Sequence, residues 1–141
     1  FGMPIRNFQA LNFKIAESVT KLDAARALVY TAARAADAAD KGLPVDPRRL
    51  VSEAKHCATD AGWEIINVAR QIMGGVGYTQ VYPMERLLRD MRLAPIWTGS
   101  NEVMKLLIQH EVYKMMELPS RDRDAEMDAM EWYKEVEKVY E

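Results

Sequence analysis

Residues 8–41 read FQALNFKIAESVTKLDAARALVYTAARAADAADK and contain neither proline nor glycine. Alanine, the residue with the highest helix propensity, recurs through the second half of this stretch. Apolar residues follow the spacing of a helix face, at Leu11, Ile15, Val19, Leu22, Leu28, Val29 and Ala32. We therefore predict one long helix that ends near Gly42, and whose alanines allow a second helix to approach closely.

Three more helices are predicted downstream, at about Pro47–Met73, Tyr82–Ala94 and Ser100–Glu117. Asp46 can cap the second helix ahead of a first-turn proline, and Ser100 can cap the fourth. The second helix should turn one apolar face inward, made of Leu50, Val51, Ala54, Cys57, Ala58, Ala61, Ile65, Val68 and Ile72.

No alternation of apolar and polar residues indicates a strand, and no segment repeats. We therefore predict an all-α fold, a four-helix up-down bundle that occupies residues 1–118. Beyond Pro119 the chain is rich in charge, and we expect residues 119–141 to form an extra C-terminal helical tail with a few apolar side chains for docking.

Composition excludes several classes of function. A chain of 141 residues is expected to form one domain, and its net charge of −2 gives no basic surface for nucleic acid or for an anionic membrane. No apolar run is long enough to cross a membrane. Cys57 is the single cysteine, so no internal disulfide can form and we expect a reducing compartment. The chain opens on Phe1 and reads like the middle of a protein, which suggests an excised domain.

Two short segments between the predicted helices carry the functional signal. Gln71–Tyr78 reads QIMGGVGY, and its three glycines remove side chains from a backbone that must turn sharply or be approached closely. Ile96–Glu102 reads IWTGSNE and leads into a helix, whose first N–H groups suit an anion. Either segment alone is most often a tight connection. Together they predict a phosphate-bearing ligand near helix ends.

These motifs resemble the carboxy-terminal helical domain of the acyl-CoA dehydrogenase family. The resemblance runs from Phe1 to about Met116 and includes four segments in the family's order. They are Phe-Gly-x-x-Ile-x-x-Phe-Gln at 1–9, Gln-x-x-Gly-Gly-x-Gly-Tyr at 71–78, Tyr-Pro-x-Glu-Arg-Leu-x-Arg-Asp at 82–90 and Ile-Trp-Thr-Gly-Ser-Asn-Glu at 96–102.

The resemblance implies an FAD-dependent enzyme that dehydrogenates an acyl-CoA thioester between its α and β carbons. The flavin is the electron sink in such an enzyme, and the family usually passes the electrons to an electron-transfer flavoprotein. Members are typically homodimers or homotetramers. The residues implied to contact FAD are Gln9, Gln71, Gly74, Gly75, Trp97, Ser100 and Glu102. Of these, Gln71 and the two glycines would reach the cofactor of a neighbouring subunit.

Thr98 and Gly99, in the segment at 96–102, are implied to line the acyl pocket. Thr98 departs from the family's pattern. Many members carry the catalytic glutamate where this chain has Thr98, which is followed by Gly99. A threonine hydroxyl is too weak a base to remove an α-proton at neutral pH, so we assign no catalytic residue to this chain. The base could lie on a helix ahead of Phe1, or the substrate could be an acyl group with a ring, for which the family varies the base.

Two other functions stay open at this point. The chain could be a helical assembly module without catalysis, or a ferritin-like carboxylate metal protein. The latter requires two Glu-x-x-His pairs, but the sequence offers only Glu53 and His56, because Leu107 stands three positions before His110. For the enzyme we expect the cytoplasm, or the mitochondrial matrix if the source is eukaryotic.

Overall fold

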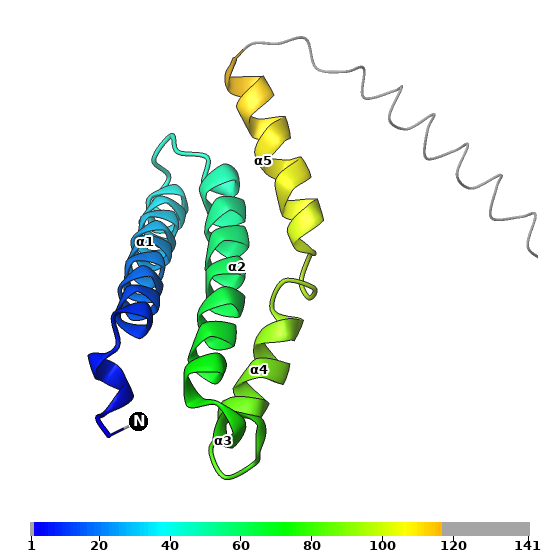
Figure 1. The fold of residues 1–141 in the computed structure, drawn as a ribbon. Helices are drawn as coiled ribbons and strands as arrows, with labels where there is room; N and C mark the ends of the chain where they lie inside the picture. The colour runs from blue at the N-terminus through cyan, green and yellow to red at the C-terminus, as the bar shows by residue number, and fades with distance from the viewer. Residues whose placement is uncertain (1, 117–141) are drawn as a thin grey trace, which may run out of the picture. The chain divides into compact units, whose positions relative to one another are not determined.

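The computed structural model describes residues 2–116 of the chain (Figure 1). Its elements are a 3-10 turn η1 (Ile5–Asn7) and the helices α1 (Gln9–Asp40), α2 (Arg48–Met73), α3 (Gly75–Tyr78), α4 (Met84–Leu93) and α5 (Asn101–Met115). These residues include no strand, which confirms the predicted all-α class. The four predicted helices correspond to α1, α2, α4 and α5. The expected tail, residues 119–141, lies outside the described residues.

The chain divides into two compact units, Phe1–Ile108 and Gln109–Glu141. Helix α5 begins in the first unit and ends in the second. Within the second unit, Glu111 is buried and lies 3.9 Å from the ammonium of Lys114. The remaining description concerns the first unit. No helix formed by residues 2–116 is both long and apolar enough to cross a lipid bilayer.

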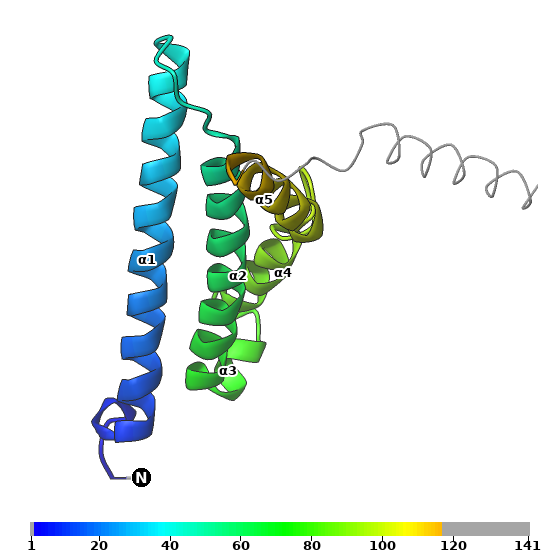
Figure 2. The ribbon, with the colours of Figure 1, turned by 90° about the horizontal axis from the view of Figure 1, so that it is seen from above.

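Helices α1 and α2 form an antiparallel pair, and α4 packs on the side of α2 that faces away from α1 (Figures 1 and 2). The connection between α1 and α2 turns at Gly42, whose φ of +77° suits glycine. The Asp46 carboxylate then accepts a hydrogen bond of 3.1 Å from the Arg48 backbone, as expected of a capping residue. The end of α1 and the start of α2 are therefore set by local signals in the sequence.

Small side chains dominate the contact between α1 and α2. The buried apolar residues in the described part of the chain are Ala25 and Ala32 on α1 and Ala54 on α2. Alanine lets helix backbones approach closely but buries little apolar surface per residue. The pair is therefore close-packed without a large core of its own.

Helix α4 is held on α2 by one close contact and one ring contact. A β-carbon on Gly62 of α2 would lie 2.5 Å from the methyl carbon of Met91, so glycine leaves space for this methionine. At the next position of each helix, the guanidinium of Arg92 lies 5.4 Å from the centre of the Trp63 ring, within range of a cation–π interaction. These contacts place the last turn of α4 beside α2.

The apolar faces of the two long helices are only partly covered. On α1 the stripe divides into a covered side, which includes Ala32, and an exposed side made of Ile15, Val19, Leu22 and Val29. Val51 on α2, which the periodicity places inside, is also exposed. The periodicity of a helix identifies its apolar face, but it does not say whether the same chain covers that face. The exposed side of α1 is therefore open to another surface.

Candidate functional site

The first candidate segment is the glycine turn at the end of α2. Gly74 ends the helix with a φ of +62° and a ψ of −144°, a conformation essentially restricted to glycine, and its N–H donates to the carbonyl of Gln71 at 3.2 Å. A β-carbon built on Gly74 or Gly75 would meet no atom within 4 Å. The backbone here is bare and accessible, so a flat or extended ligand could approach it closely.

Gly77 has a different role from its two neighbours. It is buried in α3, and a β-carbon there would lie 2.8 Å from the β-carbon of Met73 and 2.9 Å from the carbonyl oxygen of Arg70. The Arg70 guanidinium also lies 5.2 Å from the centre of the Tyr78 ring. Gly77 therefore allows the short helix α3, which the sequence did not predict, to fold back onto the end of α2.

The second candidate segment is the turn between α4 and α5. The N–H groups of Ile96 and Trp97 donate to the carbonyl of Leu93 at 2.9 and 3.1 Å, and the N–H of Asn101 donates to the carbonyl of Pro95 at 2.9 Å. These bonds bring the chain back on itself within a few residues. Trp97 stands at the outside of this turn with 55% of its surface exposed, so its ring is available to a ligand.

Within this turn the backbone is strained at Thr98. Its φ of +48° is the single positive value for a residue other than glycine in residues 2–116, and Gly99 follows at +90°. A β-branched residue in this region costs on the order of 1–3 kcal/mol and persists only where the surroundings impose it. A β-carbon on Gly99 would also lie 2.8 Å from the methyl carbon of Met104. The turn thus has a specific shape that neighbouring residues enforce.

Ser100 and Glu102 form the start of α5. The Ser100 hydroxyl accepts a hydrogen bond of 3.4 Å from the N–H of Val103, so its expected capping role is confirmed. The Glu102 carboxylate accepts from its own backbone N–H and from the Ser100 hydroxyl, and these bonds hold the pKa of Glu102 below its ordinary value. Lys105 and Lys55 lower this pKa further by charge. The helix start therefore carries a persistent negative charge, and its first N–H groups, from Asn101 to Met104, already have acceptors.

A partly buried polar cluster, which sequence reasoning missed, joins this turn to α2. The side-chain oxygen of Asn101 accepts from the Lys55 ammonium at 2.7 Å. Its side-chain nitrogen donates to the Thr59 hydroxyl at 3.0 Å and to the Asp60 carboxylate at 2.7 Å. Only 4% of the Asn101 surface is exposed. The partners lie 41 to 46 positions away in the chain, so no local pattern could have predicted them.

The candidate residues lie in two places. Gln9 begins α1, and the other members of this first group, Gln71, Gly74 and Gly75, lie at the end of α2. Since these helices are antiparallel, the first group lies at one end of the pair (Figures 1 and 2). The second group, Trp97 to Glu102, lies at the far end of α4, a helix of ten residues and roughly 15 Å at 1.5 Å per residue. Helix α4 therefore keeps the two groups apart within one chain.

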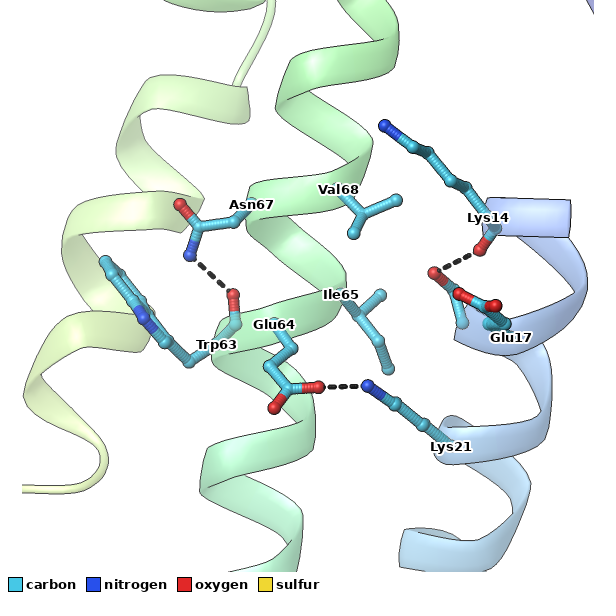
Figure 3. Close-up of a pocket in the computed structure, with 9 residues that line it drawn as sticks. Lys14, Glu17, Lys21, Trp63, Glu64, Ile65, Asn67 and Val68 are labelled. Carbon is cyan, nitrogen blue, oxygen red and sulfur yellow. Dashed lines mark hydrogen bonds and ion pairs between the residues drawn. The ribbon is translucent and has the colours of Figure 1, made fainter. Parts of the chain in front are cut away.

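A separate groove between α1 and α2 does not include any of these residues. It has a volume of about 380 Å³ and is lined by Lys14, Glu17, Ser18, Lys21, Trp63, Glu64, Ile65, Asn67 and Val68 (Figure 3). An ion pair between Lys21 and Glu64 closes across it, while Asn67 donates to the Trp63 carbonyl at 2.7 Å. The side chains of Lys21, Glu64 and Asn67 therefore already have partners within the chain. We therefore do not assign a chemical role to the groove.

No group of three or more His, Cys, Asp or Glu side chains within the described residues is arranged to hold a metal ion. The His56 ring nitrogen Nδ1 lies 2.9 Å from the Asp60 carboxylate. Despite this distance, Nδ1 has no hydrogen-bond partner among the described residues. His56 and Glu53 therefore stand without the second pair that a carboxylate metal centre needs.

The described residues thus form a helical domain that presents two separate turns with exposed residues. Residues 1–113 match the family described as acyl-CoA dehydrogenase, C-terminal domain. The chain belongs to this family, as its motifs indicated, and the ferritin-like alternative is not favoured. Members of the family are oligomeric flavoproteins that act on acyl-CoA substrates.

The relatives are enzymes of greater length. The chain is 41% identical over 114 residues to the 3-(aryl)acrylate reductase of Clostridium sporogenes and 40% identical over 114 residues to the cyclohexane-1-carbonyl-CoA dehydrogenase of Geobacter metallireducens. In both comparisons the match covers 81% of this chain and 29% of the relative. The structure of butyryl-CoA dehydrogenase from Megasphaera elsdenii superposes with a TM-score of 0.71 at 35% identity, over 79% of this chain and 28% of that one. The chain therefore spans less than a third of these relatives.

Proposed function

We propose that this chain is the carboxy-terminal flavin-contacting and oligomerisation domain of an FAD-dependent acyl-CoA dehydrogenase, an oxidoreductase of fatty acid or related acyl metabolism. The observation that carries the proposal is the family match over residues 1–113, because the two turns described above coincide with the motifs on which the resemblance was based. The enzyme would oxidise an acyl-CoA thioester in the cytoplasm or the mitochondrial matrix and pass electrons to an electron-transfer flavoprotein.

The glycine turn fits the diphosphate part of a dinucleotide. Gly74 and Gly75 leave their backbone open, with no atom near the place of a β-carbon, so diphosphate or ribose oxygens could lie against it. Gln71 is exposed just before the turn, and Gln9 begins the neighbouring helix. Both amides can donate to and accept from the cofactor. Gln71 and the two glycines would bind the FAD of a partner subunit.

The turn between α4 and α5 fits a second part of a flavin site. Trp97 offers an exposed aromatic face that can lie against a flavin ring system. The Ser100 hydroxyl can rotate from the Glu102 carboxylate to donate to a phosphate oxygen instead. Glu102 can accept from a ribose hydroxyl, because its lowered pKa keeps it ionised at neutral pH.

Since α4 separates the two groups, we infer that each completes a different cofactor site, and that the working unit is at least a homodimer. The exposed side of α1 offers an apolar surface for that contact. The second function considered above, assembly without catalysis, would use the same surface but would not need either turn.

When bound, the flavin would supply the acceptor for the hydride that leaves the β-carbon. The residues of this chain would bind and orient, and Thr98 with Gly99 would shape one wall of the acyl pocket. Neither Thr98 nor Glu102 suits the removal of the α-proton. The first is a weak base, and the pKa of the second is shifted further below neutral rather than toward it. We therefore assign the removal of the α-proton to neither of these two residues.

The acyl group itself remains a choice between straight or branched chains and rings. Two relatives are named for ring-containing compounds, an arylacrylate and a cyclohexane carboxylate thioester. Thr98 is also smaller than the glutamate it replaces and would leave more room beside the flavin. A panel of straight, branched and cyclic acyl-CoA thioesters, assayed with the whole enzyme, would distinguish them.

The test compares the 141-residue chain with the whole enzyme that contains it. We expect the whole enzyme to purify with one FAD per subunit, seen in its visible absorption, and to reduce an electron acceptor when acyl-CoA is added. The chain alone should bind FAD weakly, because it holds only part of each site. A whole enzyme without flavin, or a short chain that binds FAD tightly and stoichiometrically, would contradict the proposal.

A further inference from the structure

We propose that Asn101 is a positioning residue, which holds the strained turn from Trp97 to Ser100 against α2. The inference rests on the proposed function for its catalytic meaning, but the contacts themselves do not depend on any ligand. Asn101 is not among the residues that the sequence indicated. It lies directly after the capping residue Ser100 and is the most buried residue of the turn.

The cluster fixes the orientation of the Asn101 side chain. Its oxygen faces the Lys55 ammonium, and its nitrogen faces the Asp60 carboxylate. The reverse orientation would place an NH₂ group against a cation and an oxygen against an anion, so only one arrangement is stable. The Thr59 hydroxyl accepts the second hydrogen of the Asn101 nitrogen and donates to the Lys55 carbonyl at 2.9 Å. All donors and acceptors of this carboxamide therefore have directional partners on one face of α2.

The same residue closes the turn through its backbone. The Asn101 N–H donates to the Pro95 carbonyl at 2.9 Å, so the residues in between must fold outward as a loop. Within that loop lie Thr98 and Gly99, both at positive φ. Because Thr98 adopts a conformation that side-chain-bearing residues rarely keep, something must impose it. Asn101 is joined both to α2 and to the start of the loop, so it is placed to do so.

This arrangement gives the turn a fixed place and the exposed groups a fixed direction. Trp97 lies exposed, and Ser100 and Glu102 form the start of α5. None of them hydrogen-bonds to the cluster, although Lys55 acts on Glu102 through its charge. Substituting Asn101 should therefore loosen these groups without touching a ligand. The effect would differ from that of a core residue, because α1 makes no contribution to the cluster.

The experiment uses four variants of the 141-residue chain: Asn101→Asp, Asp60→Asn, the two together, and Lys55→Met. In Asn101→Asp a carboxylate replaces the NH₂ group 2.7 Å from the Asp60 carboxylate, and the repulsion should open the turn. We expect hydrogen exchange of the residue-101 amide to rise by about tenfold or more, while the central amides of α1 and α2 keep their protection. In the double variant the carboxamide introduced at position 60 can donate to the carboxylate introduced at position 101, which still accepts from Lys55. Protection should therefore return to within about threefold of the original chain.

Unchanged exchange in Asn101→Asp, or failure of the double variant to restore protection, would overturn the proposal. If Asn101→Asp unfolds the whole chain, Lys55→Met provides the test instead. This variant removes the ammonium that donates to the Asn101 side-chain oxygen, and it adds no repulsion. Faster exchange limited to the turn supports positioning, and exchange equal to the original refutes it. In the whole enzyme, Asn101→Asp should likewise lower the affinity for FAD, and the double variant should restore it. The expected exchange pattern without any effect on FAD would count against the proposed function, and not against positioning.

Discussion

Met91 on α4 lies against Gly62 on α2 so closely that a β-carbon at position 62 would stand 2.5 Å from the methionine's terminal methyl carbon. The neighbouring pair, Trp63 and Arg92, adds a ring contact at 5.4 Å. Since α4 leads directly into the turn that carries Trp97, this helix contact determines the position of half of the candidate site.

Gly62→Ala should nevertheless be tolerated. The atom in the way is the free end of a flexible side chain, which can rotate aside, and alanine favours the helix over glycine by about 1 kcal/mol. We expect the free energy of unfolding to change by less than about 1 kcal/mol in urea titrations. Gly62→Val is the matched variant, because its branched side chain cannot be accommodated by rotation of Met91 alone and should lower the midpoint. Equal stability for both variants would show that the helices are not in close contact here.

Gly77→Ala should be clearly destabilising. Here a β-carbon would meet the carbonyl oxygen of Arg70 at 2.9 Å and the β-carbon of Met73 at 2.8 Å, and neither atom can move without the helix backbone. Overpacking of this kind typically costs about 1–3 kcal/mol. Urea unfolding of the variant, compared with Gly62→Ala, measures the difference. Similar midpoints for the two alanine variants would mean that α3 does not fold back onto α2.

The helices were predictable because their limits are local. Gly42 and Pro83 end and begin a helix through their own backbone preferences, while Asp46 and Ser100 cap α2 and α5 through their side chains. The short helix α3 was not predictable, because a Gly-Val-Gly-Tyr sequence has low helix propensity and forms a helical turn only through its packing against α2.

The candidate site was predictable as two motifs, but not as an arrangement. The residues that the sequence indicated are exposed or lie at helix ends, where residue type alone is informative. The polar cluster of Asn101 could not be predicted, because each of its members looks ordinary along the chain, and only the approach of α5 to α2 brings a cation and an anion to the same carboxamide. The prediction that Val51 of α2 faces inward is wrong for a similar reason, since burial depends on what lies opposite.

Gly75→Ala separates folding from ligand contact. Position 75 has no neighbouring atom within 4 Å of a β-carbon and no positive φ, so alanine should leave the unfolding midpoint of the chain unchanged. In the whole enzyme the added methyl group would stand where we place the cofactor of the partner subunit, and we expect FAD affinity to fall by about tenfold. Fluorescence titration of the apoenzyme with FAD measures this affinity. Unchanged affinity would remove the glycine turn from the flavin site.

Ser100→Ala should raise the pKa of Glu102 toward its ordinary value. The Ser100 hydroxyl is the second largest cause of the lowered pKa, after the backbone N–H of Glu102 itself, so only part of the shift should be lost. Because the folded pKa lies below the reference value of 4.5, Glu102 contributes stability above pH 4.5 and loses it as the pH falls through the folded pKa. NMR titration of the Glu102 carboxyl carbon reports this directly. Ser100→Thr keeps the hydroxyl and should leave the pKa low, and a rise in both variants would point to the helix start rather than to the hydroxyl.

The exposed side of α1 predicts self-association of the 141-residue chain. Its members Ile15, Val19, Leu22 and Val29 follow spacings of four, three and seven, which is the seam of a helix that packs against another helix. Val19 is 51% and Leu22 43% exposed, although side chains of this kind gain about 1.5–3 kcal/mol when fully buried. We therefore expect dimers or tetramers in sedimentation velocity experiments at micromolar concentration.

Leu22→Lys places a charge in the centre of the seam and should give monomers with an unchanged helix content. Thr20→Lys adds the same charge on the opposite side of α1 and should leave the assembly intact. A monomeric original chain, or equal behaviour of the two lysine variants, would show that this surface meets something other than a second copy.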